Sequence, residues 1–479
     1  MLVPINLTGG TYKHKSLPVS AQSTINLVPV KQTDEKAFST YILDTFPGKK
    51  SMPLTGYWTG VTAQGADRGL FEHQGLLYHV AGESLLSVDT DGLHTFLGSI
   101  PGAGRCIFAP SGTNIVISTD GVRYQWNGTT VATISDGDLE TGNSAAHLNS
   151  QILYDGLNGR FCSSDVGDAT SINALNYATA ESDADLLLRV YTFNQVAFMM
   201  GEKTIEPWYN SGQGNPPFDR YEGAQINVGL GAIHSVANDD DSVYFLGDDF
   251  QVYVMRGGAS SVIAPVTTAP MVKEFRDYSD VSDAIGWCMN MDGQWQYHLT
   301  FPTANKTWVY IVGGEWFQLS SGSSGGRDRS GSYAFCFGKH IIADYETGEV
   351  YELDSETYAD VGEEIIRTRD SAPIHGGLIQ KPGKSLTMNK LEIFLEAGVG
   401  LVSPSAQGYD PEIMVSFSDD GGHTFSEEIW AKVGRLGEFQ KRVEFNALGT
   451  FTERIIRLRM SDPVHWCVYS AAAEIEVGI

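Results

Sequence analysis

The chain has 479 residues, with 32 Lys and Arg against 58 Asp and Glu, and its formal net charge is −26. This length predicts roughly two to four domains whose cores need neither disulfides nor metal ions for stability. The acidity argues against non-specific binding of nucleic acid, because such binding depends on neutralising phosphates. The charge also favours solubility.

Neither the cysteines nor the hydropathy pattern indicates a secreted or membrane protein. The cysteines are widely spaced and odd in number, without a CxxC motif: Cys106, Cys162, Cys288, Cys336 and Cys467. This pattern predicts buried free thiols and gives no support to a zinc site. The N-terminus lacks the pattern of a signal peptide, and no stretch reaches the length of a transmembrane helix. We expect folding in a reducing cytoplasm, with no membrane insertion and no cofactor.

Residues 1–55 differ from the rest of the chain. They are polar, contain prolines and carry few hairpin signals. We interpret them as an N-terminal arm that lies on other surfaces.

Residues 56–372 consist of short runs that alternate apolar and polar residues, separated by turn signals. Typical runs are 75–80, 114–118, 242–246, 251–255, 307–311 and 349–353. Asp-Gly and Asn-Gly pairs recur between them, and such pairs tolerate the positive φ angles of tight hairpins. Long helical patterns are nearly absent, and only residues 270–276 suggest a short helix. At about 45 residues per four-stranded blade, the segment predicts a β-propeller of six or seven blades. A pair of β-sandwiches is the competing architecture.

Residues 373–479 predict a separate, sandwich-like β unit. The expected strands are longer and lie at 391–395, 413–417, 442–445, 455–459 and 473–477. The whole chain is therefore expected to be all-β.

One hairpin in this C-terminal unit has a recognisable pattern. Its residues Ser418, Asp420, Gly422, Thr424 and Phe425 resemble the Asp-box of sialidases and related propellers. There the aspartate and serine bond backbone amides and the aromatic packs on the sheet, away from the active site. The resemblance implies a structural role. It also keeps a carbohydrate-active or glycan-binding propeller open as an alternative function.

Other patterns that could carry catalysis lack the context that catalysis requires. Residues 322–326 match GxSxG, but a nucleophile elbow needs a strand before it and a helix after it. Acidic pairs at Asp89 and Asp91 and at Asp239–Asp241 lack a full calcium-loop pattern and predict solvated turns. The histidines show no metal-binding spacing. We therefore expect no catalytic residues and no metal site.

Several phrases, read in order, resemble the tail nozzle proteins of short-tailed bacteriophages, also called packaged-DNA stabilisation or tail tubular proteins. These phrases are Gln22–Val30, Thr45–Gly48, Arg68–Phe71, Leu77–Val80, Gly201–Gly212, Val228–Ser235, Val243–Gly247 and Ser416–Phe425. The phrase at 201–212 is the most specific of them. Their order and spacing hold across nearly the whole chain.

The resemblance implies a non-enzymatic subunit of the virion tail, made in the host cytoplasm before assembly. Such proteins form a homohexameric ring below the portal and its head-to-tail adaptor, where they retain packaged DNA and conduct it during ejection. The implied partners are the adaptor, a tail needle or plug, tail fibres or spikes, and viral DNA that passes without tight binding. The resemblance does not identify the residues that line the DNA channel.

Overall fold

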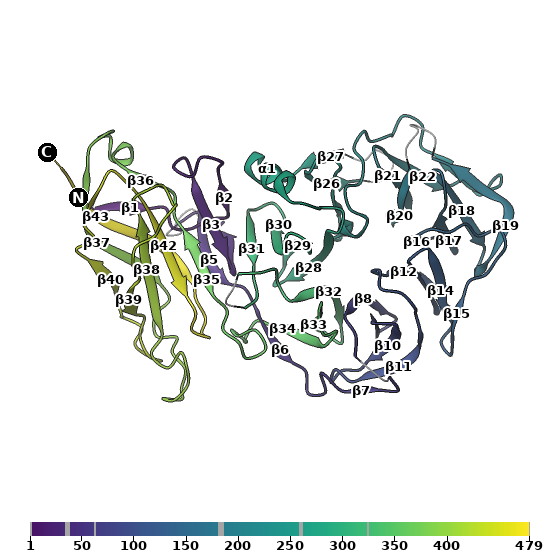
Figure 1. Ribbon diagram of the computed structural model, residues 1–479, viewed down its shortest axis with the longest axis horizontal. Helices are drawn as coiled ribbons and strands as arrows, with labels where there is room; N and C mark the ends of the chain where they lie inside the picture. The colour runs from purple at the N-terminus through teal and green to yellow at the C-terminus, as the bar shows by residue number, and fades with distance from the viewer. Residues whose placement is uncertain are drawn as a thin grey trace.

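The computed structural model describes residues 2–33, 39–61, 64–180, 186–257, 262–322 and 325–478. Its regular elements are almost all strands. Within these ranges there are one α-helix, α1 (Ala269–Asp277), and two short 3-10 helices, η1 (Ile233–Ser235) and η2 (Gly376–Ile379). The short helix expected at 270–276 is confirmed, with a proline in its first turn, where its missing N–H costs no hydrogen bond. Figure 1 shows a ring of sheets beside a smaller two-layered unit.

The ring is a β-propeller of seven blades, counted over the described residues. Blade one contains β8 (Asp67–His73), β9 (Leu76–Ala81), β10 (Ser84–Val88) and β11 (His94–Ser99), with β7 (Trp58–Thr59) added at its edge; blade two contains β12 (Ile107–Ser111), β13 (Asn114–Thr119), β14 (Val122–Trp126) and β15 (Val131–Thr133). Blade three contains β16 (Ala145–Leu148), β17 (Gln151–Asp155), β18 (Arg160–Asp165) and β19 (Asp168–Thr179); blade four contains β20 (Leu187–Phe193), β21 (Val196–Gly201), β22 (Ile205–Asn210) and β23 (Phe218–Arg220).

The remaining blades complete the circle. Blade five contains β24 (Ala237–Asn238), β25 (Ser242–Leu246), β26 (Val252–Arg256) and β27 (Val262–Pro265); blade six contains β28 (Ile285–Met291), β29 (Gln294–Phe301), β30 (Lys306–Ile311) and β31 (Trp316–Leu319). Blade seven contains β32 (Ser330–Cys336), β33 (Lys339–Asp344), β34 (Val350–Asp354) and β6 (Gly48–Ser51). Six blades are separate sheets, whereas blade six continues into the neighbouring unit. The expected propeller is confirmed, and the competing pair of sandwiches is wrong.

Turn chemistry explains several of the hairpins that build these blades. Both residues of the pairs Asp120–Gly121, Asn158–Gly159 and Asp292–Gly293 take positive φ angles. That backbone matches the twist of a tight hairpin and suits asparagine, aspartate and glycine. The pair Asp155–Gly156 has no positive φ, so this dipeptide is not a hairpin turn of that type.

The propeller core is divided among the gaps between blades. Each pair of adjacent blades encloses its own cluster of buried apolar side chains, and the clusters close into a circle. Strand β17 shows the consequence, because all five of its residues are buried. Central strands with a neighbouring blade on each face bury both faces, so the stacking of neighbours stabilises each blade.

The second unit is a β-sandwich of two sheets packed around one apolar core. One sheet contains β4 (Leu27–Lys31), β5 (Tyr41–Thr45), β43 (Val468–Val477), β37 (Leu386–Leu395) and β40 (Val443–Asn446), with β1 (Leu2–Ile5) and β41 (Thr450–Phe451) alongside. The other contains β3 (Ala21–Ile25), β35 (Arg367–Asp370), β42 (Glu453–Met460), β38 (Glu412–Ser418) and β39 (Ile429–Lys432), with β2 (Tyr12–Lys13) and β36 (Ile374–His375). Strand β3 also pairs with β31, which joins the sandwich to blade six.

The N-terminal segment differs from the expected arm. Strands β1 to β5 belong to the sandwich, and β6 pairs with β34 as the outer strand of blade seven. The N-terminal segment joins the sandwich because apolar residues alternate with other residues along it. The side chains of Val3, Ile5 and Leu7 all lie in the sandwich core. In Figure 1 the purple N-terminal strands lie among the yellow and green C-terminal ones.

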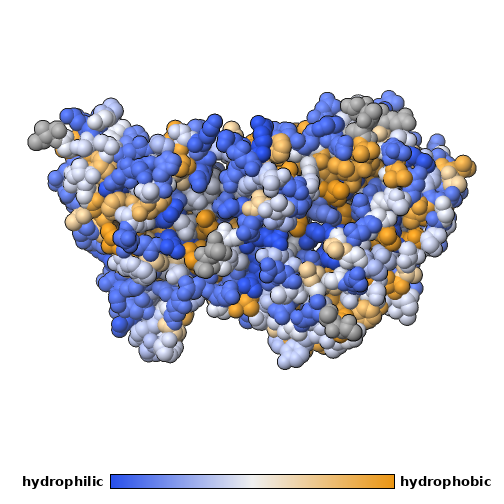
Figure 2. All heavy atoms as spheres, in the orientation of Figure 1, coloured by the Kyte–Doolittle hydropathy of each residue, from blue (hydrophilic) through white to orange (hydrophobic). Residues whose placement is uncertain are grey.

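The surface on the side seen in Figure 1 is mostly hydrophilic. Figure 2 shows that hydrophilic side chains cover most of this face, with apolar areas scattered between them. No helix among the described residues is long and apolar enough to cross a membrane.

Candidate functional site

The hairpin that follows β38 is held by the side chain of Asp420. Its carboxylate accepts hydrogen bonds from the His423 amide (2.9 Å), the Thr424 amide (2.9 Å) and the Thr424 hydroxyl (2.6 Å). The Ser418 hydroxyl donates to Asp420 (2.6 Å) and accepts from the Gly422 amide (2.8 Å). These bonds stabilise the charged carboxylate, so the pKa of Asp420 lies well below its usual range. The turn is therefore closed by its own side chains.

The aromatic residue of this hairpin lies against an arginine of the sheet. The Arg457 guanidinium lies 3.6 Å from the ring centroid of Phe425. The same arginine forms a bidentate ion pair with Asp370, with N–O distances of 2.7 and 2.9 Å. Phe425 is only partly buried, so it caps the arginine at the sheet surface. The predicted residues thus come together in one hairpin, which contacts β42 through Arg457.

Arg369 and Asn26 hold the N-terminal segment against the junction of the two units. Arg369 is fully buried and donates hydrogen bonds to the carbonyls of Leu7 and Gly10 and to the side chains of Gln22 and Thr24. Sequence reasoning missed this arginine, because its partners lie more than 340 positions away.

Asn26 connects blade six with the strand that enters the sandwich. Its side-chain amide donates to the carbonyls of Ser320 (2.9 Å) and Ile366 (2.8 Å), and its oxygen accepts from the Ser320 amide. It has a φ of 58°, a conformation that asparagine adopts more readily than most residues. This residue lies within the phrase 22–30 that carried part of the family resemblance.

A buried lysine secures the closure of blade seven. Lys49, on β6, lies 2.7 Å from Asp328 and 3.7 Å from Asp360, and all three side chains are at most 5% exposed. Lysine so deeply buried requires carboxylate partners. Lys49 lowers the pKa of Asp328 to about 2, against the opposing effect of burial. The pairing joins the N-terminal strand to both ends of blade seven.

A groove with a volume of about 760 Å³ lies between the sandwich and blade six. On its sandwich side, His465 contacts Asp44 (2.8 Å) and Glu396 (2.9 Å) through its two ring nitrogens. The bond to Asp44 is the main cause of a raised pKa for His465. This histidine therefore carries its positive charge to a higher pH than a free one.

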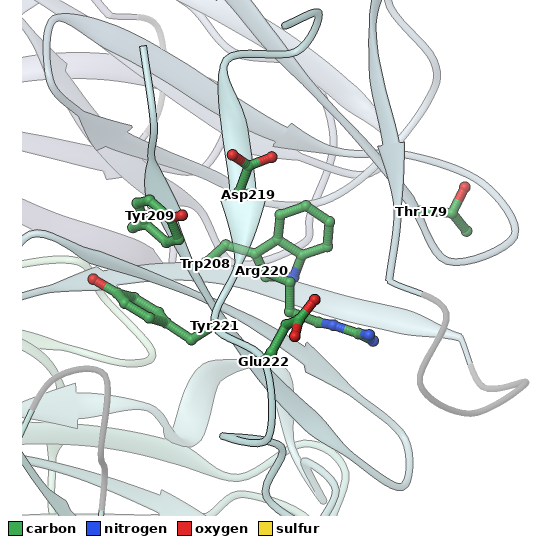
Figure 3. Close-up of a pocket in the computed structure, with 7 residues that line it drawn as sticks. All are labelled: Thr179, Trp208, Tyr209, Asp219, Arg220, Tyr221 and Glu222. Atoms are coloured by element: carbon green, nitrogen blue, oxygen red, sulfur yellow. The ribbon is translucent and has the colours of Figure 1, made fainter. Parts of the chain in front are cut away.

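The phrase at 201–212 forms part of a shallow groove on blade four, with a volume of about 660 Å³ (Figure 3). The rings of Tyr209 and Tyr221 lie 4.5 Å apart at one side of it. Trp208 also lines the groove, and it packs edge-on against Phe161 of blade three at 4.9 Å, while its indole N–H donates to Glu206. The phrase thus serves packing between blades, and the groove presents the two tyrosines together with charged groups of both signs.

One buried polar cluster looks like a catalytic constellation but is closed to solvent. Asp67 accepts from Ser332 (2.7 Å) and contacts His79 (3.2 Å), which contacts His94 (3.0 Å). Trp58 stacks on His94 at 4.5 Å. Burial lowers the pKa of His94 to about 3, and neither histidine has exposed surface. The cluster therefore packs blade one against blade seven.

The other chemical patterns of the sequence have ordinary structural surroundings. Asp89 accepts the amides of Asp91 and Leu93, and Asp239 accepts those of Asp241 and Ser242, as turn residues do. Ser323 and Ser324 of the GxSxG match lie outside the described residues. Within the described ranges no group of His, Cys, Asp and Glu residues could hold a metal ion. The five cysteines form no disulfide, and four of them are buried.

Solved structures align with most of the chain at low identity. The WD40 domain of Pan2 from Neurospora crassa has 11% identity and a TM-score of 0.41, over 67% of this chain and 97% of that chain. The WD40 propeller domain of Doa1 has 12% identity and a TM-score of 0.40, over 65% and 98%. BamB from Moraxella catarrhalis has 10% identity and a TM-score of 0.38, over 70% and 97%. A search of curated protein sequences finds no significant match.

Two family models together match nearly the whole chain. One, described as bacteriophage P22 Gp10, beta-propeller, matches residues 1–358. The other, described as bacteriophage P22 Gp10, beta-sandwich, matches residues 374–476. Both architectures are present here, although strands β1 to β5 of the first range belong to the sandwich. The chain therefore belongs to the bacteriophage P22 Gp10 family of tail nozzle and packaged-DNA stabilisation proteins.

Proposed function

We propose that the chain is one subunit of a closed, six-fold ring in the virion tail, below the portal and its adaptor. The ring retains packaged DNA and conducts it during ejection. The observation that carries this proposal is the family match across both the propeller and the sandwich. Its partners are further copies of itself, the adaptor, a needle or plug, and fibres or spikes. Before assembly the subunit resides in the host cytoplasm.

The continuity between the two units supports a load-bearing role. The sheet of blade six runs through β3 into the sandwich, so the two units share backbone hydrogen bonds. Arg369 and Asn26 reinforce the same junction. A subunit built in this way transmits force between its ends without a flexible linker, which suits a ring that holds DNA under pressure.

The charge supports sliding of DNA rather than binding. At −26 per chain, a ring of several subunits repels the phosphates of a duplex that passes through it. A basic wall would bind the duplex and slow its passage. We place Lys and Arg at subunit and adaptor contacts, and neutral or acidic groups at the channel.

We place most subunit contacts in residues 1–55 and 373–479, which lie outside the propeller except for β6. Strands of residues 1–55 are already paired within the sheets of the subunit. The support for this placement therefore comes from the exposed apolar side chains of residues 373–479. Val402 and Phe439 are more than 70% exposed, and their loops are joined by a hydrogen bond between Gly437 and Gly398. Burial of such side chains against a neighbouring copy stabilises a closed ring.

Native mass spectrometry of the purified chain, alone and mixed with its adaptor, tests the ring. We expect monomers or weak oligomers alone and a closed hexamer on the adaptor. Phe439→Asp should prevent ring formation, whereas Val166→Asp, an equally exposed site on the propeller, should not. Stable dimers that hydrolyse a glycan would favour the carbohydrate-active alternative. Duplex DNA should not bind the isolated chain at physiological salt, and salt-sensitive micromolar binding would contradict the sliding channel.

A further inference from the structure

A small cavity lies where the inner strands of several blades approach the axis of the propeller. Its volume is about 160 Å³, and it is lined from β8, β12, β20 and β28 and from the segment around η1. In Figure 1 β8, β12 and β28 are grouped near the middle of the ring. The polar groups in its wall are the side chains of Arg105, Arg189 and His234.

The two arginines of this cavity differ in their partners. Arg105 forms an ion pair with Asp67, at 3.3 Å. Arg189 forms no ion pair with any carboxylate of the described residues, although the chain has far more acids than bases. One of its terminal nitrogens donates to the carbonyl of Ile233, and its guanidinium lies 5.2 Å from the ring centroid of Tyr191. Its Nε is buried and has no hydrogen-bond partner.

Arg369 provides a comparison, because it is a buried arginine whose hydrogen-bond donors are satisfied by the protein itself. Arg369 likewise forms no ion pair with the described part of the chain, but its guanidinium donates hydrogen bonds to four oxygen atoms. Among the described residues Arg189 has one such acceptor, and its positive charge and its Nε–H have no counterpart there. Arg189 is partly buried, and a partly buried positive charge with so few acceptors is stabilised by an anion beside it.

His234 adds a neutral polar group to the same wall. Burial and the charges of Arg105 and Arg189 lower the pKa of His234 to about 3. At neutral pH it therefore offers one N–H donor without adding charge. The wall of the cavity therefore combines several hydrogen-bond donors with the positive charge of Arg189, unpaired among the described residues. The chain as a whole is acidic.

We propose that this axial cavity binds one small oxyanion of the phosphate type, held between Arg189 and Arg105 with His234 beside it. The volume corresponds to only a few water molecules, at ~30 Å³ each, so it admits a free phosphate or sulfate but not a nucleic acid duplex. The anion would join blades two and four through their arginines and the entry to blade five through His234. The anion would stabilise the propeller from within, and its binding would depend neither on ring assembly nor on DNA.

Calorimetric titration of the full-length chain with inorganic phosphate, at constant pH and ionic strength, tests this site. We expect one phosphate per chain and a melting temperature that rises with phosphate and follows the measured Kd, since the ligand binds only the folded state. Arg189→Gln should abolish both effects. The control is Arg160→Gln, because Arg160 also lies over a tyrosine ring, at 4.4 Å, but is paired with Glu140 and lies away from the axis.

A second variant keeps the proposal testable if Arg189→Gln does not fold. Arg189→Lys retains the charge but loses the planar donor fork, and we expect its phosphate affinity to fall at least tenfold. The absence of binding heat in the wild-type chain would overturn the proposal. So would an equal phosphate effect in the wild type and in a folded Arg189→Gln variant, because that outcome would be a general salt effect.

Discussion

The propeller and the sandwich are both mainly antiparallel, yet they take their strands from the chain in opposite ways. Each of the first six blades is built from four consecutive strands, and its core is shared only with its neighbours. The sandwich pairs β1 with β43 and β3 with β35, so its core needs both ends of the chain at once. Local contacts make the blades modular, whereas distant contacts make the sandwich a single cooperative unit.

Blade seven lies between these two cases. Three of its strands are consecutive, but the fourth, β6, comes from the N-terminal region and brings Lys49 with it. The circle therefore closes through the same segment that builds the sandwich. The following variants test how far the two units depend on each other.

The largest effect is expected from deletion of residues 2–31, which removes β1 to β4. The sandwich loses β1, which is one of the strands paired with β43, and it loses β3, the strand between β31 and β35, so we expect it to unfold completely. The propeller retains β6 and every other blade strand and should remain folded. Limited proteolysis with mass spectrometry would detect a resistant fragment that starts near residue 48 and ends near residue 360. Loss of that fragment would show that the units are not separable.

Replacement of Lys49 by methionine should have the next largest effect. Asp328 would lose its buried cation, and Asp360 would keep only Arg329, at 3.4 Å. Breaking a buried ion pair in this way costs about 3–5 kcal/mol of folding free energy. Urea denaturation provides the measurement. Lys50→Met is the control, since its pair with Asp354 is exposed and should matter little; similar losses in the two variants would refute a special role for the buried pair.

Asp420→Ala should produce a smaller loss that is confined to the sandwich. The variant leaves the amides of His423 and Thr424 without their acceptor, but these amides are exposed and water replaces part of the loss. We expect a modest decrease in the melting temperature of the sandwich and none in that of the propeller. Calorimetry separates the two transitions if they are distinct. An unchanged melting temperature would show that the hairpin is an ordinary surface turn.

The smallest effect is expected from the protonation of His465. Its folded pKa is raised by Asp44 and Glu396, so the charged form stabilises the sandwich. That contribution is fully present below the unfolded pKa of about 6.5 and is lost as the pH rises through the higher folded value. The stability of the wild type relative to His465→Gln should therefore decrease as the pH rises above about 6.5. A difference that does not depend on pH would contradict this role.

Sequence reasoning succeeded where the signal was local. The alternating runs at 75–80, 114–118 and 307–311 overlap β9, β13 and β30, and the hairpin from Ser418 to Phe425 forms its own bonds. It failed for the N-terminal strands, because a strand such as β1 has only four residues and a partner more than 460 positions away. Arg369 and Lys49 were missed for the same reason, since only the folded chain brings their acceptors together.

The position of β6 has a consequence for synthesis on the ribosome. This strand emerges early, but its partner β34 is translated roughly 300 residues later, which at ordinary rates is about 15–60 s. During that interval the edge of β6 and the apolar faces of β1 and β4 have no native partner. Nascent chains of several neighbouring ribosomes could then pair through these edges, as unpaired strands do. Host chaperones that shield N-terminal segments should therefore raise the yield of folded protein more than those that act after release.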